Sequence, residues 1–390
     1  MAEEFAHKIK RLELENFTCF GKVALDFSPG INVFIGENGT GKTHLLKVLY
    51  MSTNQRLKEF IEESLGSKNP AIKEIVERGK HIGRVLASIP SGVVLENYYP
   101  SAIEASSLKK AKATGRTFVK IEKDGRVLGL DLNEFNRNMV GYESFKKGTF
   151  NIGFKHDAVF IPSQEMISWF EGFSDLYENY VNAFDPTYFF LSKSLSRPIP
   201  KGKQAEKAKQ LILEIEKEVN IKVQFDGRKF IVYSNQLNGS GGEGFEAPLV
   251  ATGINKLAQL IQLTMNGAIY PGSIIIWDEP ESGLNPKYIN TVAQFLLTLA
   301  NAGCQIFVAT HDYLLPYHLS LSVEYAEVMK KMKQPVPPMK FFSLYKGEDG
   351  TKVEEGDDMP SIHHDAIMEG HSYYNEFEKE LFRKFVNEGA

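Results

Sequence analysis

Eight consecutive residues of this chain have the types and the spacing that hold a phosphate group. Residues 36–43, Gly-Glu-Asn-Gly-Thr-Gly-Lys-Thr, match the pattern G-x-x-x-x-G-K-[ST] of a phosphate-binding loop. The glycines let main-chain N–H groups approach phosphate oxygens closely. We expect Lys42 to reach the β- and γ-phosphates of a nucleotide and the Thr43 hydroxyl to bind Mg²⁺. The residues expected to contact the nucleotide here are Gly36, Glu37, Asn38, Gly39, Thr40, Gly41, Lys42, Thr43 and His44.

Polar residues also follow two apolar segments later in the chain. Residues 274–279, Ile-Ile-Ile-Trp-Asp-Glu, end in two carboxylates, and residues 306–311 end in a histidine. We expect Asp278 to hold Mg²⁺ and Glu279 to orient and deprotonate an attacking water. We expect His311 to hydrogen-bond the γ-phosphate, because ligands bind at the carboxyl ends of parallel strands. The predicted catalytic residues are therefore Lys42, Glu279 and His311.

The segments around these residues have the patterns of alternating strands and helices. The apolar runs 31–35 and 158–162 predict buried strands, and a helix is expected to open at His44. Residues 203–219 predict an amphipathic helix. Asp-Gly pairs at 124–125 and 226–227 predict hairpins. Further strands are expected at 8–15, 23–27 and 339–345, with an acidic loop after the last and a final helix at about 373–386, and residues 239–244 have the composition of a flexible linker.

The composition is that of a globular protein with room for two or three domains. The chain has 390 residues, of which 43% are hydrophobic and 24% charged, and its formal net charge is −4. Any nucleic-acid site must therefore be a local patch. Cys19 and Cys304 have no metal-ligand spacing, and we see neither a signal peptide nor an apolar run of ~20 residues. These features predict a cytoplasmic protein without a membrane segment.

Together, these motifs resemble the ABC-type ATPases of the RecF/SMC-like branch, which are often classified as AAA-type. In that family a signature motif opens a helix shortly before the Asp-Glu strand. Residues 251–257 are similar to it, with Thr252 and Gly253 keeping the hydroxyl and the close backbone approach. Residues 282–286 resemble the family's loop that crosses to a partner subunit, with Asn285 where Asp is usual. The resemblance implies nucleotide contacts by Thr252, Gly253, Asn255 and Asn285.

The family also uses a glutamine between its two lobes to contact Mg²⁺ and the attacking water. Gln164, which follows the strand expected at 158–162, is the best candidate by position. It would contact both the nucleotide and the metal. Gln224 and Gln236 remain alternatives for this role.

The resemblance implies an α/β fold: an ABC-type P-loop ATPase head with a RecA-like core sheet, an antiparallel β subdomain and a helical lobe that carries the signature motif. We expect the nucleotide-binding core at 1–95 and 268–346 and a β-rich insertion at 96–157. The helical lobe would span 158–267, and a tail helix would lie within 347–390.

The resemblance also implies that the chain binds ATP with Mg²⁺, hydrolyses it to ADP and phosphate, and forms a homodimer across ATP. A higher oligomer is left open. One hypothesis is a sensor that regulates an effector, a nuclease or toxin from a neighbouring gene, as in the ATPase subunits of bacterial anti-phage systems. The other is a RecF-like ATPase of DNA repair or recombination, with DNA on the basic residues of 108–126.

Three further sequence features affect how the function of the chain is predicted. No heptad arms separate Lys42 from Gly253, which favours the regulatory hypothesis. A basic run such as 108–126 is also typical of a solvated sheet face. A metal site at the tail would need more ligands than the incomplete group it offers, which consists of His363, His364, Asp365 and His371.

Overall fold

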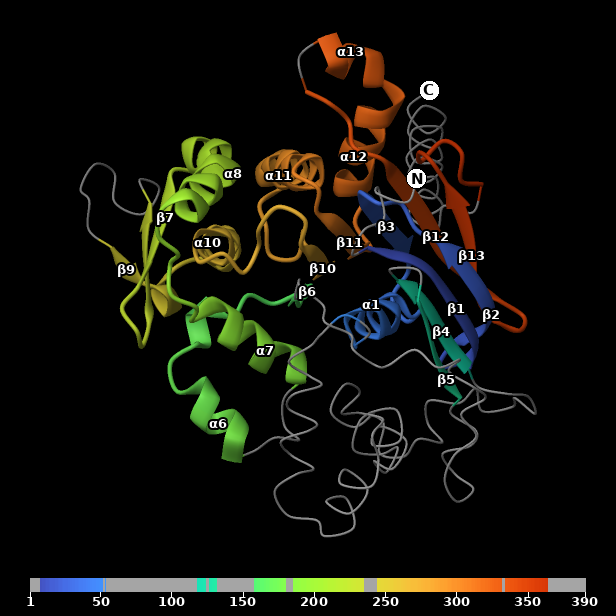
Figure 1. Ribbon diagram of the computed structural model, residues 1–390, viewed down its shortest axis with the longest axis horizontal. Helices are drawn as coiled ribbons and strands as arrows, with labels where there is room; N and C mark the ends of the chain where they lie inside the picture. The colour runs from blue at the N-terminus through green and yellow to red at the C-terminus, as the bar shows by residue number, and fades with distance from the viewer. Residues whose placement is uncertain are drawn as a thin grey trace, which may run out of the picture.

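The computed structural model describes residues 8–51, 53, 118–123, 126–131, 158–179, 185–234, 244–331 and 334–363. Its centre is one 10-stranded sheet in the order β5-β4-β1-β2-β13-β12-β3-β11-β10-β6 (Figure 1). Five neighbouring strands of this sheet run parallel. They are β6 (Ala158–Ile161), β10 (Ile274–Asp278), β11 (Gln305–Thr310), β3 (Ile31–Gly36) and β12 (Met339–Gly347).

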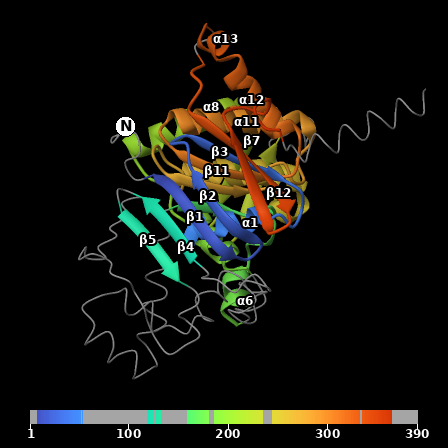
Figure 2. The same cartoon turned by 90° about the vertical axis from the view of Figure 1, so that its right-hand side faces the viewer.

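The other half of the sheet is mostly antiparallel. β12 turns back into β13 (Gly350–Gly356), which touches β2 in parallel, and β2, β1, β4 and β5 then pair antiparallel. Figure 2 shows β5, β4, β1 and β2 side by side. Their bounds are β1 (Ile9–Phe17), β2 (Phe20–Asp26), β4 (Phe118–Lys123) and β5 (Arg126–Asp131).

Helices cover both faces of the parallel half because its strands are apolar on both sides. α1 (Lys42–Met51) packs on one face, where its Leu45 joins Ile276 and Phe307 in one apolar cluster. α11 (Ile289–Asn301) packs on the other face, where its Phe295 joins Ile275 in a second cluster. Neighbouring residues of a strand thus point to opposite faces. α12 (Leu314–Glu324) and α13 (Ala326–Lys331) follow β11.

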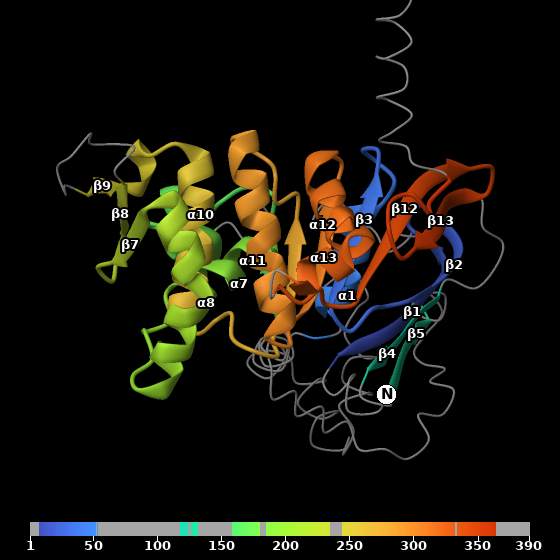
Figure 3. The same cartoon turned by 90° about the horizontal axis from the view of Figure 1, so that it is seen from above.

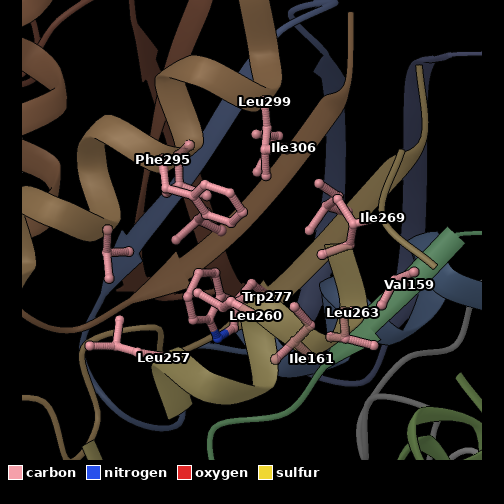
Figure 4. Close-up of a cluster of buried hydrophobic side chains, with 14 of the residues drawn as sticks. Val159, Ile161, Leu257, Leu260, Leu263, Ile269, Trp277, Phe295, Leu299 and Ile306 are labelled. Carbon is pink, nitrogen blue, oxygen red and sulfur yellow. The ribbon is translucent and has the colours of Figure 1, made fainter. Parts of the chain in front are cut away.

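A second layer of helices and a small sheet lies beyond the β6 edge. α10 (Thr252–Met265) packs against α8 (Lys203–Val219), and α8 in turn contacts α11 (Figure 3). Figure 4 shows Leu260 of α10 beside Trp277, and Leu263 beside Ile161. The remaining elements are α6 (Phe173–Asn179), α7 (Pro186–Leu195), the antiparallel strands β7 (Ile221–Phe225), β8 (Phe230–Ser234) and β9 (Phe245–Glu246), and three 3₁₀ turns (Ile167–Trp169, Ala247–Leu249, Pro286–Tyr288).

The α/β fold class expected from the sequence is confirmed, with two differences in how segments are used. The sequence predicts an acidic loop here, but residues 350–356 form β13, which pairs antiparallel with β12 and buries Thr351. Residues 158–161 were grouped with the helical lobe, but they form the edge strand of the core sheet. The helix at 373–386, the linker at 239–243 and most of 96–157 lie outside the described residues.

Candidate functional site

The carboxyl ends of three parallel strands bring the expected site residues to one edge of the sheet. In the strand register, Ala309 of β11 lies opposite Asp278 of β10, and Thr310 lies opposite Ile35 of β3. The phosphate loop, the two carboxylates and His311 therefore leave the sheet at the same level. This is the edge at which α/β sheets bind ligands.

The phosphate loop bends tightly around its lysine. Gly41 has φ +93°, and a Cβ there would lie 2.3 Å from Cys19 Sγ, so only glycine fits. The ammonium of Lys42 donates to the carbonyl oxygens of Gly36 (2.7 Å) and Glu37 (2.9 Å). Burial lowers the pKa of Lys42, and the carboxylate of Asp278 acts in the opposite direction. The N-terminus of α1 follows at once and adds its positive dipole end to this cation.

Thr43 and Asp278 meet across the site although 235 residues separate them in sequence. The Thr43 hydroxyl donates to Asp278 Oδ2 at 2.8 Å. Asp278 Oδ1 is buried and has no hydrogen-bond partner among the described residues. Burial raises the pKa of Asp278, which the Thr43 hydrogen bond opposes. A hydroxyl beside an underused carboxylate oxygen fits a hard cation such as Mg²⁺, whose remaining ligands are water and phosphate oxygens.

No cluster of three or more His, Cys, Asp or Glu side chains arranged to hold a metal occurs in the part of the chain that the structure describes. His44, on the same first turn of α1, has its pKa lowered by burial and by Lys47.

Glu279 and His311 form a contact pair at the mouth of the site. Glu279 has φ +47°, an unusual value for a residue with a side chain, and its N–H donates to the Ala309 carbonyl at 2.8 Å. This turn carries the carboxylate away from β10 and toward His311, whose Nδ1 lies 3.1 Å from Glu279 Oε1. The positions expected for a base and a phosphate sensor are thus in direct contact before a nucleotide is considered.

The expected signature residues lie at the exposed start of α10. Thr252 is exposed, and no side chain caps the helix. A Cβ on Gly253 would lie 2.7 Å from the Gly283 carbonyl oxygen, so the glycine is required by packing within the chain. Asn255 is fully buried and donates to the Ala247 carbonyl (2.8 Å), which makes its side chain part of the helix support.

Two other expected contacts are exposed. Asn285 accepts from the Lys287 N–H (3.1 Å) and so caps its own 3₁₀ turn. Gln164 follows β6, whose Ile161 pairs with Trp277 of β10, so Gln164 lies at the same sheet edge as the carboxylates. Gln224 lies on β7 of the small sheet, where it accepts from the Tyr233 hydroxyl (3.2 Å), and Gln236 is outside the described residues. Position on the sheet therefore favours Gln164.

Two charged residues that the sequence did not single out lie beside the carboxylates. Lys256 of α10 is only 1% exposed, and its ammonium donates to the carbonyl oxygens of Glu279 and Ser282, each at 2.8 Å. Burial lowers its pKa to about 8, against the raising effect of the carboxylate of Glu281. Glu281 itself is buried and accepts from the Thr310 hydroxyl at 2.6 Å. The sequence did hold a signal for Lys256, because it is a charged residue in a helix whose other residues are mostly apolar.

Comparison with known proteins agrees with this arrangement. Residues 8–126 match the family described as "AAA ATPase domain". Residues 150–315 match the family described as "AAA domain, putative AbiEii toxin, Type IV TA system". The first match contains the phosphate loop and the second contains both carboxylates and His311. Fold and site thus define an ABC-type P-loop ATPase.

Curated relatives narrow the class. The chain is 55% identical over 42 residues to the DNA replication and repair protein RecF of Streptococcus uberis, covering 11% of this chain and 12% of that protein. It is 27% identical over 170 residues to RecF of Streptococcus suis, covering 36% of this chain and 45% of that protein. The chain thus spans less than half the length of these relatives. The chain is thus similar to RecF proteins and to AAA ATPase domains.

Among solved structures, the SMC head domain from Thermotoga maritima matches with a TM-score of 0.41 and 11% identity, covering 89% of this chain and 98% of that one. None of the helices in the described ranges has the length and apolar character needed to cross a membrane.

Proposed function

We propose that this chain binds ATP with Mg²⁺ and hydrolyses it to ADP and phosphate. The observation that carries the proposal is the 2.8 Å contact between Thr43 and Asp278, beside a carboxylate oxygen that lacks a partner among the described residues. A bound Mg²⁺ would neutralise charge on the β- and γ-phosphates. Thr43 and Asp278 would hold that ion, and Lys42 would exchange its loop carbonyls for phosphate oxygens.

Glu279 would act as general base in this proposal. Glu279 directly follows β10 and is next to the residue that would hold the metal, so its carboxylate would contact a water between it and the γ-phosphate. His311 shares that carboxylate and would contact the γ-phosphate. Lys256 would keep the turn in place by holding the main-chain carbonyl of Glu279.

The second half of the site would come from another copy of the chain. Thr252 is exposed at the start of α10, and the loop 283–287 beside it is largely exposed as well. A helix N-terminus attracts a phosphate, so ATP bound to one copy would attract α10 of another. The nucleotide would then favour a closed homodimer by its higher affinity for that state, and hydrolysis would release it.

We further propose that this ATP-controlled dimer regulates a protein effector in bacterial anti-phage defence. The description of the second matched family mentions a toxin and a Type IV TA system, which is consistent with a chain that works with a toxic or nucleolytic partner. The partner would bind the closed and the open dimer with different affinities.

A DNA-handling ATPase is the second candidate, because the curated relatives are named for DNA replication and repair. The described basic residues in the 108–126 region and on the neighbouring strand β1 offer it limited support. Lys120 pairs with Glu13 (3.0 Å), Arg11 pairs with the same carboxylate (2.9 Å), and Lys10 pairs with Glu122 (3.3 Å). Cations that already have carboxylate partners are weaker phosphate ligands.

Hydrolysis of radiolabelled ATP tests the proposal, measured with and without Mg²⁺ and with and without duplex DNA. We expect Mg²⁺-dependent release of phosphate by the wild type and none by Glu279→Gln, which keeps the size of the side chain and removes the base. Strong stimulation by DNA that weakens with salt would favour the second candidate. A Glu279→Gln variant as active as the wild type would contradict the assignment of the base.

A further inference from the structure

A third carboxylate, which the proposed mechanism does not use, lies directly behind His311. Glu281 follows Asp278 by three residues, and its side chain is 7% exposed. Its Oε1 accepts from the Thr310 hydroxyl at 2.6 Å. Its Oε2 is buried and has no hydrogen-bond partner among the described residues. Burying a carboxylate is costly unless it is paired or hydrogen-bonded. A buried carboxylate with one unpaired oxygen therefore indicates a functional role.

The position of this carboxylate is fixed by the strand that carries His311. The Thr310 hydroxyl accepts from the Asp312 N–H at 3.0 Å, which leaves the hydroxyl hydrogen for Glu281. Thr310 is itself fully buried at the end of β11. The hydrogen bond to Thr310 therefore holds the Glu281 side chain in one position beside His311.

His311 lies between two carboxylates. Its Nδ1 is 3.1 Å from Glu279 Oε1 and 4.0 Å from Glu281 Oε1. The side chain of His311 is 44% exposed, whereas Glu281 is held from behind, so His311 is the partner with room to move. A small rotation of the imidazole would exchange one acceptor for the other.

We propose that Glu281 is a positioning residue for His311, taking the Nδ1–H of the imidazole when Glu279 turns to the attacking water. This inference rests on the proposed ATPase function. While His311 donates to Glu279, the carboxylate that should accept the proton of water is occupied. Transfer of the hydrogen bond to Glu281 frees Glu279 and fixes the ring.

The same transfer of the hydrogen bond also orients the other ring nitrogen of His311, Nε2. With Nδ1–H bonded to Glu281, the ring plane is set and Nε2 is the nitrogen that remains for the γ-phosphate. A histidine that donates from both nitrogens carries a positive charge, which a carboxylate at Nδ1 stabilises. Glu281 would thus act on catalysis only through His311 and would not touch the substrate.

Steady-state ATPase kinetics of four proteins test this inference: wild type, Glu281→Gln, His311→Ala and the double variant. We expect Glu281→Gln to lower kcat by about tenfold or more and to leave KM within about twofold, because the groups that orient a functional histidine have effects of this size. If Glu281 acts through His311, the double variant should match His311→Ala within about twofold. Losses that multiply in the double variant would overturn the inference.

Thr310 offers a second, milder pair of variants if Glu281→Gln proves unstable in urea denaturation. Thr310→Val removes the hydroxyl that holds Glu281, and Thr310→Ser keeps it. We expect the first to lower kcat and the second to stay close to the wild type, and equal rates for both would contradict the role of Glu281. An inactive wild type would instead refute the proposed ATPase, whereas an active wild type with unaffected variants would refute only this inference.

Discussion

The phosphate-loop lysine shows how the site is arranged without a ligand. Lys42 is 5% exposed, and its ammonium is satisfied by two carbonyls of its own loop. Burial of a cation would be costly without those bonds and the carboxylates nearby. A phosphate must therefore replace bonds that already exist, and the loop is held in shape for it in advance.

Replacing Lys42 with alanine should abolish measurable ATP binding in calorimetry. The substitution removes the cation and leaves the Gly36 and Glu37 carbonyls facing the phosphates, so attraction is replaced by repulsion. Lys209→Ala is a matched control that removes an exposed lysine on α8, outside the loop. ATP affinity equal to that of the wild type in Lys42→Ala would contradict the loop assignment.

The buried ammonium of Lys256 predicts a specific pH dependence of stability. Burial lowers its pKa to about 8 in the folded chain, from an ordinary value of 10.5. Between these values the unfolded chain keeps a proton that the folded chain has lost. The free energy of unfolding should therefore rise with pH in this window, by up to about 1.4 kcal/mol per pH unit for this group.

Urea unfolding of the wild type and Lys256→Met at several pH values isolates this effect. Methionine has a similar length and no titratable group, so the difference between the two proteins reports Lys256. We expect the wild type to gain stability relative to the variant between pH 8 and 10.5. A difference that does not change with pH would show that Lys256 keeps its ordinary pKa in the folded chain.

At the scale of elements, the start of α10 and the loop after β10 are packed as one unit. Gly253 and the Gly283 carbonyl are too close for an intervening Cβ, and Gly283 needs its positive φ of +74°. Lys256 joins the same two elements through the Glu279 and Ser282 carbonyls. The exposed end of α10 and the turn that carries Glu279 are therefore in direct contact.

Gly253→Ala and Thr252→Ala should separate packing from function at this junction. The added methyl group of Gly253→Ala would meet main-chain oxygen at 2.7 Å, so we expect a loss of about 1–3 kcal/mol in urea unfolding. Thr252 is exposed, so Thr252→Ala should unfold like the wild type and still lose ATPase activity if Thr252 meets the γ-phosphate of another copy. Full activity in Thr252→Ala would count against the composite site.

At the scale of the whole molecule, the proposal requires ATP to hold two copies together. A Glu279→Gln variant with ATP and Mg²⁺ should elute from gel filtration with at least twice the mass of one chain, because hydrolysis no longer opens the dimer. The same variant with ADP is the control and should elute with a lower mass. A monomer in the presence of ATP, with binding confirmed by calorimetry, would argue against an ATP-bridged dimer.

The strands, the main helices and the meeting of the candidate site residues at one end of the sheet were largely predictable from the sequence. Buried parallel strands are apolar on both faces, and this pattern occurs in the runs 31–35, 274–279 and 306–311. The candidate site residues stand at the ends of these runs or directly after them. The hairpin at Asp226-Gly227 and the helix at 203–219 have equally local signals and are confirmed. Resemblance to a known family then supplied the expected roles of Thr252, Gly253, Asn285 and Gln164.

Only the tertiary structure decided which residues support that chemistry. Residues 350–356 have the composition of an acidic loop, but they form a strand because their main chain pairs with β12, a contact that the sequence pattern does not show. Asn255, Lys256 and Glu281 took their places through contacts with main-chain carbonyls and a threonine distant in sequence. The sequence by itself predicts the candidate catalytic residues, because the motifs that carry them are local. The residues that support them depend on packing, because burial is set by the whole fold.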